Sequence, residues 1–137
     1  MTVTANSIIT PQTPRAATAV ATSANTSYSD TPTNTVALFS AGGSGSRITR
    51  ITASARATVT ATELQLFRSS DAGTTKRFFK SKLMTAYTVA QTTENVATDF
   101  GYSDDNPLVL GSGEILYAAT GVGLAGGIVF CAEGADY

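Results

Sequence analysis

The sequence predicts an all-β protein, and three observations carry that prediction. The stretch from Ser46 to Arg68 alternates small or apolar residues with polar ones and contains no proline and no glycine. Turn-forming residues recur at intervals of about 8 to 15 residues, as they do in sandwiches and barrels. Threonine, which favours strands, is abundant. We therefore expect about eight short strands in an antiparallel two-sheet sandwich of jelly-roll type, with an up-and-down barrel as the alternative.

The length of 137 residues fits one domain. We expect residues 1–15 to form an extended N-terminal arm, because Pro11 and Pro14 stand among polar residues with only Ile8 and Ile9 as apolar anchors. Such an arm either stays mobile or lies on a neighbouring molecule. Residues 16–137 are expected to form a single β-sandwich domain.

The first strands are predicted on either side of a polar loop. Ala16–Ala24 is the first candidate strand, a loop follows to Asn34, and Thr35–Ala41 is the next strand. Gly42–Gly45 is then a turn that needs the backbone freedom of glycine.

The alternating stretch is predicted to be a hairpin. One parity is apolar and the other polar, so one face can be buried. A break near residues 60–62 lets Leu64 and Leu66 resume the apolar face. The residues expected on the buried face before the break are Ile51, Ala53, Ala55, Ala57 and Val59.

The remaining strands follow strong turn signals. Ser69–Thr74 resembles a hairpin loop, and Gly111–Gly113 is a second tight turn. The strands predicted beside them are Lys76–Met84, Leu108–Leu110, Glu114–Ala119 and about Gly127–Glu133.

Composition restricts the classes of function. Only 14% of residues are charged and the net charge is -1, which provides no field to attract nucleic acid. No apolar stretch is long enough for a membrane span, and the N-terminus lacks the features of a signal peptide, so we expect synthesis in a cytoplasm. The single cysteine, Cys131, cannot form an intrachain disulfide and is expected to be a core residue.

No catalytic, cofactor-binding or metal-binding residues are assigned. Histidine is absent, so acid–base chemistry would fall to the acidic residues around one loop. A glycosidase needs an acid in a pocket and an aromatic cleft, and tryptophan is also absent. The same loop lacks the ligand spacing of an EF-hand calcium site. The loop residues considered are Glu94, Asp99, Asp104, Asp105 and Asn106.

One basic cluster is interleaved with aromatic residues. In a strand, Lys76, Lys80 and Lys82 would share a face while Phe79 packs inward. These lysines protect an edge strand from unwanted pairing, or alternatively they contact an acidic partner surface.

Four segments resemble a family of small virion structural proteins of tailed bacteriophages. The longest reads SAGGSGSRITRITASARATVTATELQLFRSSDAGTTKRFF, and the others read ATAVATSANTSYSD, PLVLGSGEILYAAT and VFCAEGADY. They occur in this order within residues 16–137. The resemblance implies a non-enzymatic structural protein located in the virion and made in the host cytoplasm. Among virion proteins, the low charge and the threonine-rich sandwich favour a head decoration protein that contacts the major capsid protein or other virion proteins.

The resemblance also favours a symmetric homo-oligomer such as a trimer, with no cofactor, nucleic acid or membrane partner. The loop of residues 121–126 corresponds to a contact loop of the family. A fibre or receptor-binding module that recognises host-surface carbohydrate is the alternative function, and a carboxylate enzyme is a third. The candidate partner-contact residues are Ile8, Ile9, Lys76, Lys80, Lys82, Val122 and Leu124.

Overall fold

The computed structural model describes residues 10–137, and this part of the chain is all β. It contains no helix, and hence none that could span a membrane. Nine strands are formed where about eight were expected, and the additional one, β6, has two residues. The strands are β1 (Thr13–Ala21), β2 (Val36–Ser40), β3 (Ser46–Ala55), β4 (Thr62–Ser69), β5 (Arg77–Met84), β6 (Thr98–Asp99), β7 (Leu108–Leu110), β8 (Ile115–Thr120) and β9 (Ile128–Asp136).

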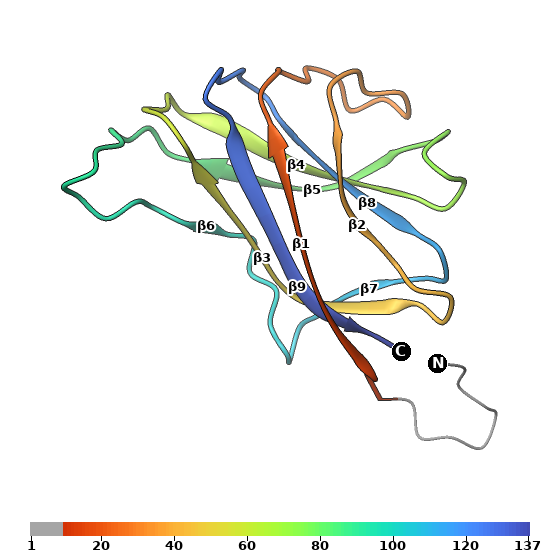
Figure 1. Ribbon diagram of the computed structural model, residues 1–137. Coiled ribbons are helices and arrows are strands. Elements are labelled where there is room, and N and C mark those ends of the chain that lie inside the picture. Colours follow the sequence, from red (N-terminus) through yellow and green to blue (C-terminus); the bar gives the residue numbers. More distant parts are fainter. Residues whose placement is uncertain (1–9) are drawn as a thin grey trace.

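The strands form two antiparallel sheets, which confirms the predicted two-sheet class (Figure 1). Sheet A has the order β1-β9-β3-β6, and β7 also pairs with β3. Sheet B has the order β2-β8-β4-β5. Neither sheet closes on itself, so the barrel alternative is wrong. In each sheet, strands that are distant in the sequence lie side by side.

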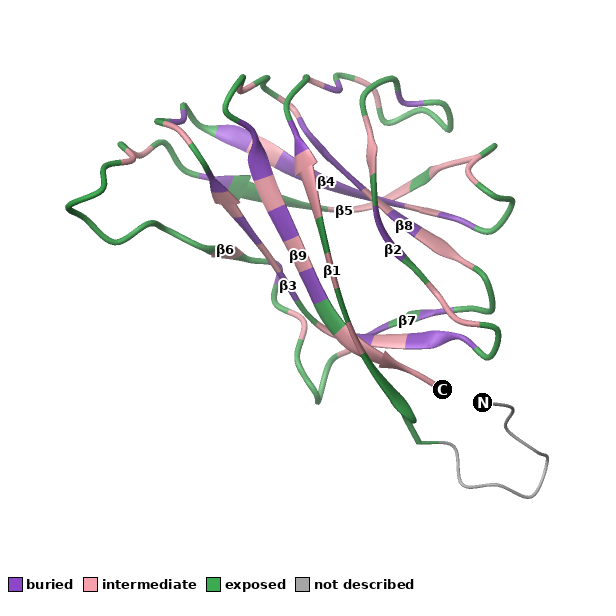
Figure 2. Cartoon of the chain, viewed as in Figure 1, coloured by how far each residue is buried: buried purple, intermediate pink, exposed green. Residues whose placement is uncertain are grey.

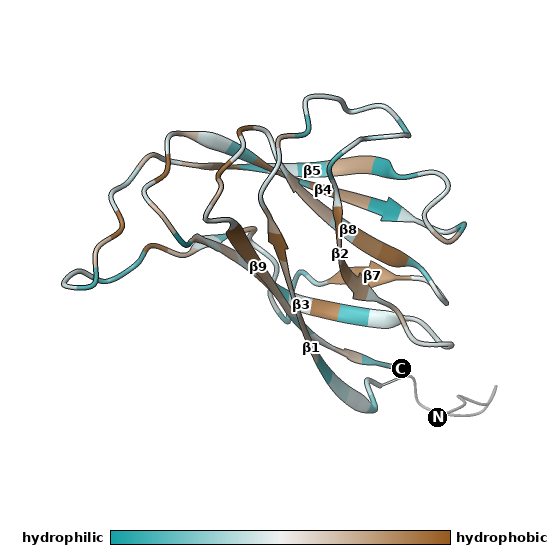
Figure 3. Ribbon diagram, turned by 45° about the horizontal axis from the view of Figure 1, so that its top comes forward, coloured by the Kyte–Doolittle hydropathy of each residue, from teal (hydrophilic) through white to brown (hydrophobic). Residues whose placement is uncertain are grey.

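The core lies between the two sheets and takes alternate residues from each strand (Figure 2). Ile51, Ala53 and Ala55 of β3 are buried as expected, and Val59 beyond it is also buried. Leu64 and Leu66 of β4 face them from sheet B and are likewise buried. Hydropathy follows the same pattern, with apolar stretches on β8 and β9 (Figure 3).

The predicted hairpin between residues 46 and 68 is wrong. β3 belongs to sheet A and β4 to sheet B, so residues 56–61 cross between the sheets instead of forming a hairpin turn. β9 pairs with one side of β3, and β8 pairs with one side of β4. Alternation identifies the buried face of each strand, but it does not identify the strand that pairs with it.

The turn of residues 69–74 does connect a hairpin, as predicted, because β4 pairs with β5. Ala72 and Gly73 have φ angles of 59° and 90°, the left-handed conformation that such loops require. The Ser69 hydroxyl oxygen accepts a hydrogen bond from the Gly73 amide at 2.9 Å. The sequence therefore encodes this local connection in its own residues.

The first strand begins and ends three residues earlier than expected. β1 starts at Thr13 and stops at Ala21, so residues 13–15 of the expected arm are part of the sheet. Backbone bonding already begins at Gln12, whose amide donates to the Asp136 carbonyl at 2.7 Å. Pro14 is compatible with this position because β1 is an edge strand. Residues 1–9 of the expected arm, including Ile8 and Ile9, lie outside the described residues.

Cys131 is not a core residue, contrary to the prediction. It is half-buried, and it alternates with the buried residues Phe130 and Ala132 of β9. Its neighbours across the sheet are Thr18 of β1 and Thr52 of β3. The apolar stretch around it suggested burial, but strand alternation places it on the outer face of sheet A.

The loop of residues 22–35 covers the outer face of sheet B. Asn25 is buried there, and its Nδ2 donates to Gln65 Oε1 at 2.8 Å. Tyr28 stacks on Phe78 with ring centroids 4.1 Å apart, and Phe78 meets Phe67 edge-on at 5.6 Å. Sheet B is thus covered on both faces in this region. The outer face of sheet A carries no such layer of described residues.

Candidate interaction surface

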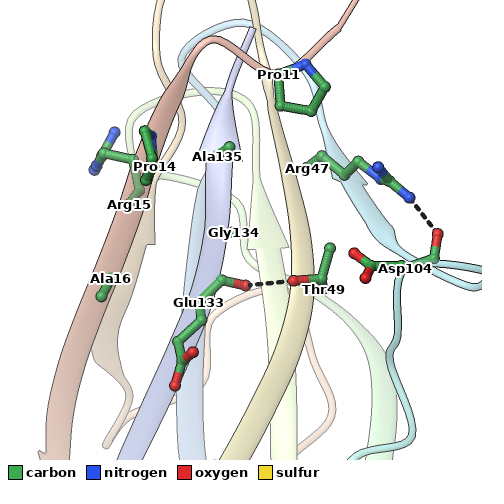
Figure 4. A pocket seen from close by; sticks show the side chains of 10 residues that line it. All are labelled: Pro11, Pro14, Arg15, Ala16, Arg47, Thr49, Asp104, Glu133, Gly134 and Ala135. Carbon is green, nitrogen blue, oxygen red and sulfur yellow. Dashed lines mark hydrogen bonds between the residues drawn. The ribbon is translucent and has the colours of Figure 1, made fainter.

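A groove of about 580 Å³ lies on the outer side of sheet A, where β1, β9 and β3 run together (Figure 4). Prolines and alanines form much of its wall, and four charged side chains stand around it. Gly134 of β9 forms part of its lining. The remaining lining residues are Pro11, Pro14, Arg15, Ala16, Arg47, Thr49, Asp104, Glu133 and Ala135.

Gly134 is required by the close approach of β9 to β3. A Cβ atom at this position would overlap the carbonyl oxygen of Arg47 and lie 2.8 Å from Cα of Ile48. The β3–β9 register shifts between Ile48 and Arg50, so the bulge adjoins this glycine. At Gly134, where the backbones of β9 and β3 approach closely, the lining of the groove therefore has no side chain.

The two arginines and the threonine of the groove are bonded within the protein, whereas the carboxylates of Asp104 and Glu133 have no partner among the described residues. The Arg47 guanidinium donates to the Asp104 carbonyl oxygen. The only hydroxyl of the lining, on Thr49, donates to the Glu133 carbonyl at 3.4 Å. The groove therefore offers a ligand an apolar wall and two carboxylates without a partner, which suits a peptide segment better than a small anion.

Arg15 and Asp136 tie the end of the groove together. Arg15 Nη1 lies 2.7 Å from Asp136 Oδ2, and Ser46 Oγ donates to Asp136 Oδ1 at 2.5 Å. Partial burial alone would raise the pKa of Asp136, but the hydrogen bonds from Ser46 and Arg15 and the charge of Arg15 lower it below its usual range. Arg15 also lies over the ring of Phe39, 4.6 Å from its centroid. Arg15 thus contacts strands of both sheets, Asp136 in β9 of sheet A and Phe39 in β2 of sheet B.

The three lysines of the basic cluster do not share one environment. Lys76 precedes β5, and its Nζ lies 4.4 Å from the ring centroid of Tyr117. Lys80 Nζ lies over Tyr102 at 4.7 Å, and Lys82 is exposed. A register shift between Leu66 and Phe67 of β4 changes the strand parity between Lys76 and Lys80. Phe79 packs partly against the core, as expected.

The loop between β8 and β9 places its two candidate residues differently. Val122 is exposed, and its amide donates to Thr62 Oγ1 at 3.0 Å. Leu124 is half-buried against the core, and its amide donates to the Thr22 carbonyl at 3.0 Å. Only Val122 therefore presents an apolar side chain to a partner. Ile8 and Ile9 cannot be placed, because they precede the described residues.

The acidic residues considered for chemistry lie on or beside the β6–β7 region and the loop before it. Asp99 Oδ1 accepts from the Gly101 amide at 2.7 Å, which shapes a local turn. Asp104, Asp105 and Glu94 are exposed. Within residues 10–137, no three histidine, cysteine, aspartate or glutamate side chains are grouped so that they could hold a metal ion.

Sequence reasoning missed the groove and the residues that fasten it. Arg15 was assigned to the arm, and Asp136 lay beyond the expected end of the last strand. The sequence signal was present in the pattern Ala-Glu-Gly-Ala-Asp at residues 132–136, where a glycine interrupts a strand. Searches with the chain match no protein-family model, no curated protein and no solved structure.

Proposed function

We propose that the protein is a non-enzymatic structural component of a tailed-phage virion, acting as a head decoration protein that coats the capsid lattice. The observation that carries the proposal is the outer face of sheet A, where two neighbouring rows of side chains across β1, β9 and β3 are neutral. Its central row reads Thr18, Cys131 and Thr52, and the next row reads Val20, Val129 and Ser54. Small neutral side chains on a sheet suit contact with another protein surface.

The strand order supports a jelly roll as the finer description of the fold. When β6 and β7 are counted as one strand, the chain changes sheet at every connection except the β4–β5 hairpin, and each sheet holds four strands, in the orders 1-8-3-6 and 2-7-4-5. This arrangement of eight strands in two facing sheets is the architecture used by viral capsid and lectin domains. A shared architecture does not by itself assign a function, so the proposal also depends on the surface and on the family resemblance.

The segments that resemble phage virion proteins include all or part of most strands. VFCAEGADY lies within β9 and its end, and PLVLGSGEILYAAT covers β7, the following turn and β8. The segment ATAVATSANTSYSD covers residues 17–21 of β1 and the first part of the loop over sheet B. The similar residues therefore include parts of both strands, β1 and β9, that carry most of the proposed contact face.

The proposed partners are the major capsid protein or another virion protein, together with further copies of this chain. The proposed location is the virion, after synthesis in the bacterial cytoplasm. Outside the sheet A face, three described residues are candidates for contacts. Lys80 and Lys82 lie on the edge strand β5, and Val122 lies at the end of the sandwich. No cofactor forms part of the proposal.

A receptor-binding fibre module that recognises carbohydrate is the second candidate, and one observation favours it. Tyr28 is 53% exposed and is held flat by stacking on Phe78, as aromatic platforms for sugars are. Glu63 accepts a hydrogen bond from the Tyr28 hydroxyl and offers carboxylate oxygens beside the ring. A fibre role predicts binding to host surface polysaccharide that is lost in Tyr28→Ala.

The deciding experiment is to measure the copy number of the protein in purified particles and its position by electron microscopy. A copy number comparable to that of the major capsid protein, with density on the capsid surface, supports the decoration role. A few copies at the neck or tail tip, or absence from particles, contradicts it. Polysaccharide binding together with a tail location would select the fibre role.

A further inference from the structure

The free edge of β1 differs from the other sheet edges of the described fold because nothing protects it. The edge strand β5 carries Arg77, Lys80 and Lys82, and charged edges resist pairing. The edge strand β2 has five residues and a register shift between Ala37 and Phe39. The fourth edge is divided between the short strands β6 and β7. By contrast, β1 has nine residues and an unbroken register with β9.

The direction of the β1 backbone groups follows from the ladder between β9 and β3. The Arg56 amide donates to the Gly127 carbonyl at 2.9 Å, directly across the extended register of these strands. In an antiparallel ladder the bonding direction alternates with each residue. Val129 and Cys131 therefore direct their backbone groups toward β3, whereas Ile128 and Phe130 direct theirs toward β1.

The alternation leaves three residues of β1 with backbone groups that point to the free edge. Ala21 and Ala19 are the partners of Ile128 and Phe130, so they bond to β9. The N–H and C=O groups of the residues between them point away from β9, and within residues 10–137 they have no hydrogen-bond partner. Two of these three residues are exposed. The three are Ala16, Thr18 and Val20.

β2 lies beside this edge but does not pair with it. At one end, Arg15 Nη2 donates to the Ser40 carbonyl at 3.1 Å. At the other end, a hollow of about 220 Å³ separates Val20 from residues 33–36. An added strand would extend sheet A above β2, in the same layered relation that the two sheets already have.

We propose that β1 pairs antiparallel with β1 of a second copy about a two-fold axis at Thr18, joining the two A sheets into one continuous sheet. In this register Thr18 faces its own copy, and Ala16 faces Val20 of the partner. All three residues direct their backbone groups to the edge, so about six hydrogen bonds can form. The small side chains meet without steric conflict, and the outer faces of the two sheets become one surface.

A second copy fits this edge because the edge is neutral and matches itself. Arg15 is bonded to Asp136, and in the paired register it lies opposite Ala21 of the partner and not opposite another charge. Pro14, which has no N–H, falls at the end of the paired segment. If β5 paired instead with β5 of a second copy, Lys80 and Lys82 would lie close to the positively charged side chains of that copy. An isologous strand pair of this kind closes after two subunits.

The proposal is independent of the virion role, and it makes the isolated protein a dimer and not the trimer that the family resemblance favours. The interface consists of backbone hydrogen bonds and small side chains. Its association should therefore change little between about 0.05 and 0.5 M salt, a range in which charge-driven contacts weaken visibly.

A cross-linking experiment tests the position of the axis. In Cys131→Ser/Thr18→Cys the only thiols of a dimer face each other, with an expected Cα separation of about 5.5 Å, which a disulfide can span. Mild oxidation should convert nearly all of this variant to covalent dimer. The matched control Cys131→Ser/Thr52→Cys carries its thiol on the same outer face, two strands from the edge, and should remain uncross-linked.

Proline substitutions test the hydrogen bonding separately from the fold. Thr18→Pro removes an N–H that points to the free edge, so it should abolish the dimer in sedimentation while the melting temperature measured at low concentration stays close to the parent value. Ala19→Pro removes an N–H that bonds β9 and should lower that melting temperature strongly. Thr18→Lys provides a second disruption that keeps the backbone intact, and it should also give monomer.

Three results would overturn the proposal. The first is a parent protein that sediments as a monomer across about a hundredfold range of concentration. The second is a trimer, or a dimer that persists in Thr18→Lys, because the contact would then lie elsewhere. The third is a failure of Thr18→Cys to cross-link in a folded dimer. If β1 pairs only with a strand of another protein, the isolated parent protein will sediment as a monomer, which is the first of these results.

Discussion

Arg15 and Asp136 join the first and the last of the described strands through a direct ion pair, with Nη1 and Oδ2 2.7 Å apart. Arg15 belongs to β1 and Asp136 is the last residue of β9, so the pair bridges positions that are 121 residues apart in the sequence. The Asp136 carboxylate also accepts from Ser46 in β3. A single carboxylate therefore fixes the relative positions of three strands at the end of the groove.

Replacing this carboxylate should destabilise the protein at neutral pH and change its acid sensitivity. The pKa of Asp136 is lowered in the folded state, so its stabilising contribution is complete above the usual unfolded value of about 3.9 and is lost as the pH falls through the folded value. Asp136→Asn should reduce the free energy of unfolding by about 1–3 kcal/mol at pH 7 and by less at pH 3. Chemical denaturation at the two pH values measures both effects.

The exposed Asp105 provides a matched control for this measurement. Its side chain makes no hydrogen bond or ion pair with the described residues, so Asp105→Asn should leave stability within about 0.5 kcal/mol of the parent at both pH values. An equal loss in Asp136→Asn at pH 7 and pH 3 would show that its carboxylate charge is not what stabilises the three strands.

The buried amide pair beneath the loop of residues 22–35 gives a second prediction. Asn25 donates to Gln65 Oε1, and Gln65 Nε2 donates to the Asn25 carbonyl at 3.2 Å. Asn25→Ala leaves the Gln65 acceptor without that donor in a buried site, so it should cost about 1–3 kcal/mol. Thr26→Ala changes an exposed neighbour and should cost less than about 0.5 kcal/mol. Equal unfolding midpoints for the two variants would exclude a stabilising role for the pair.

Cys131 should react with a thiol reagent in the native protein, because it lies half-buried on the outer face between Thr18 and Thr52. Cys131→Ser should change the free energy of unfolding by no more than about 0.5 kcal/mol, since the hydroxyl stays in contact with water. Mass spectrometry after native labelling checks the first point. A thiol that reacts only after denaturation would place this side of β9 in the core and reverse the assigned face.

Gly134 should tolerate no side chain. The Cβ of Gly134→Ala would overlap backbone atoms of Arg47 and Ile48, which cannot move without disturbing the β3–β9 ladder. We expect a loss of about 1–3 kcal/mol or more in thermal unfolding. Gly111→Ala is the control, because no atom lies within 4 Å of its added Cβ. Equal melting temperatures for the two variants would mean that β9 can shift away from the bulge.

Local patterns predicted the strands well because each strand carries its own evidence. The alternation from Ile51 to Val59 identified the buried face of β3, and Ala72 and Gly73 occur in the predicted hairpin turn. Both features arise from side-chain period and backbone conformation, which neighbouring residues determine.

The sequence could not identify strand partners, and the errors follow from that limit. β3 and β4 are adjacent in sequence, yet they do not pair with each other: β3 pairs with β9 and β4 with β8, and both of these partners come from the other end of the described chain. The groove depends on such a pairing, because Arg15 and Asp136 have no sequence pattern that relates them. The prediction that Lys76, Lys80 and Lys82 share one face is wrong for a different reason. The β4–β5 register shifts near Phe67, and this bulge changes the strand parity between Lys76 and Lys80.

The central position of β9 has a consequence for how the protein folds. The β1-β9-β3 part of sheet A cannot form until β9 inserts between β1 and β3, although β9 is the last of the described strands to be synthesised. Until then β1 and β3 are exposed strands without their main partner, and pairing over such long sequence separations is slow. In sheet B, by contrast, β4 and β5 are adjacent in the chain and can pair as a hairpin early. The β1–β9 and β3–β9 ladders should therefore form only after β9 has been synthesised, and chains stalled before residue 128 should be prone to aggregate.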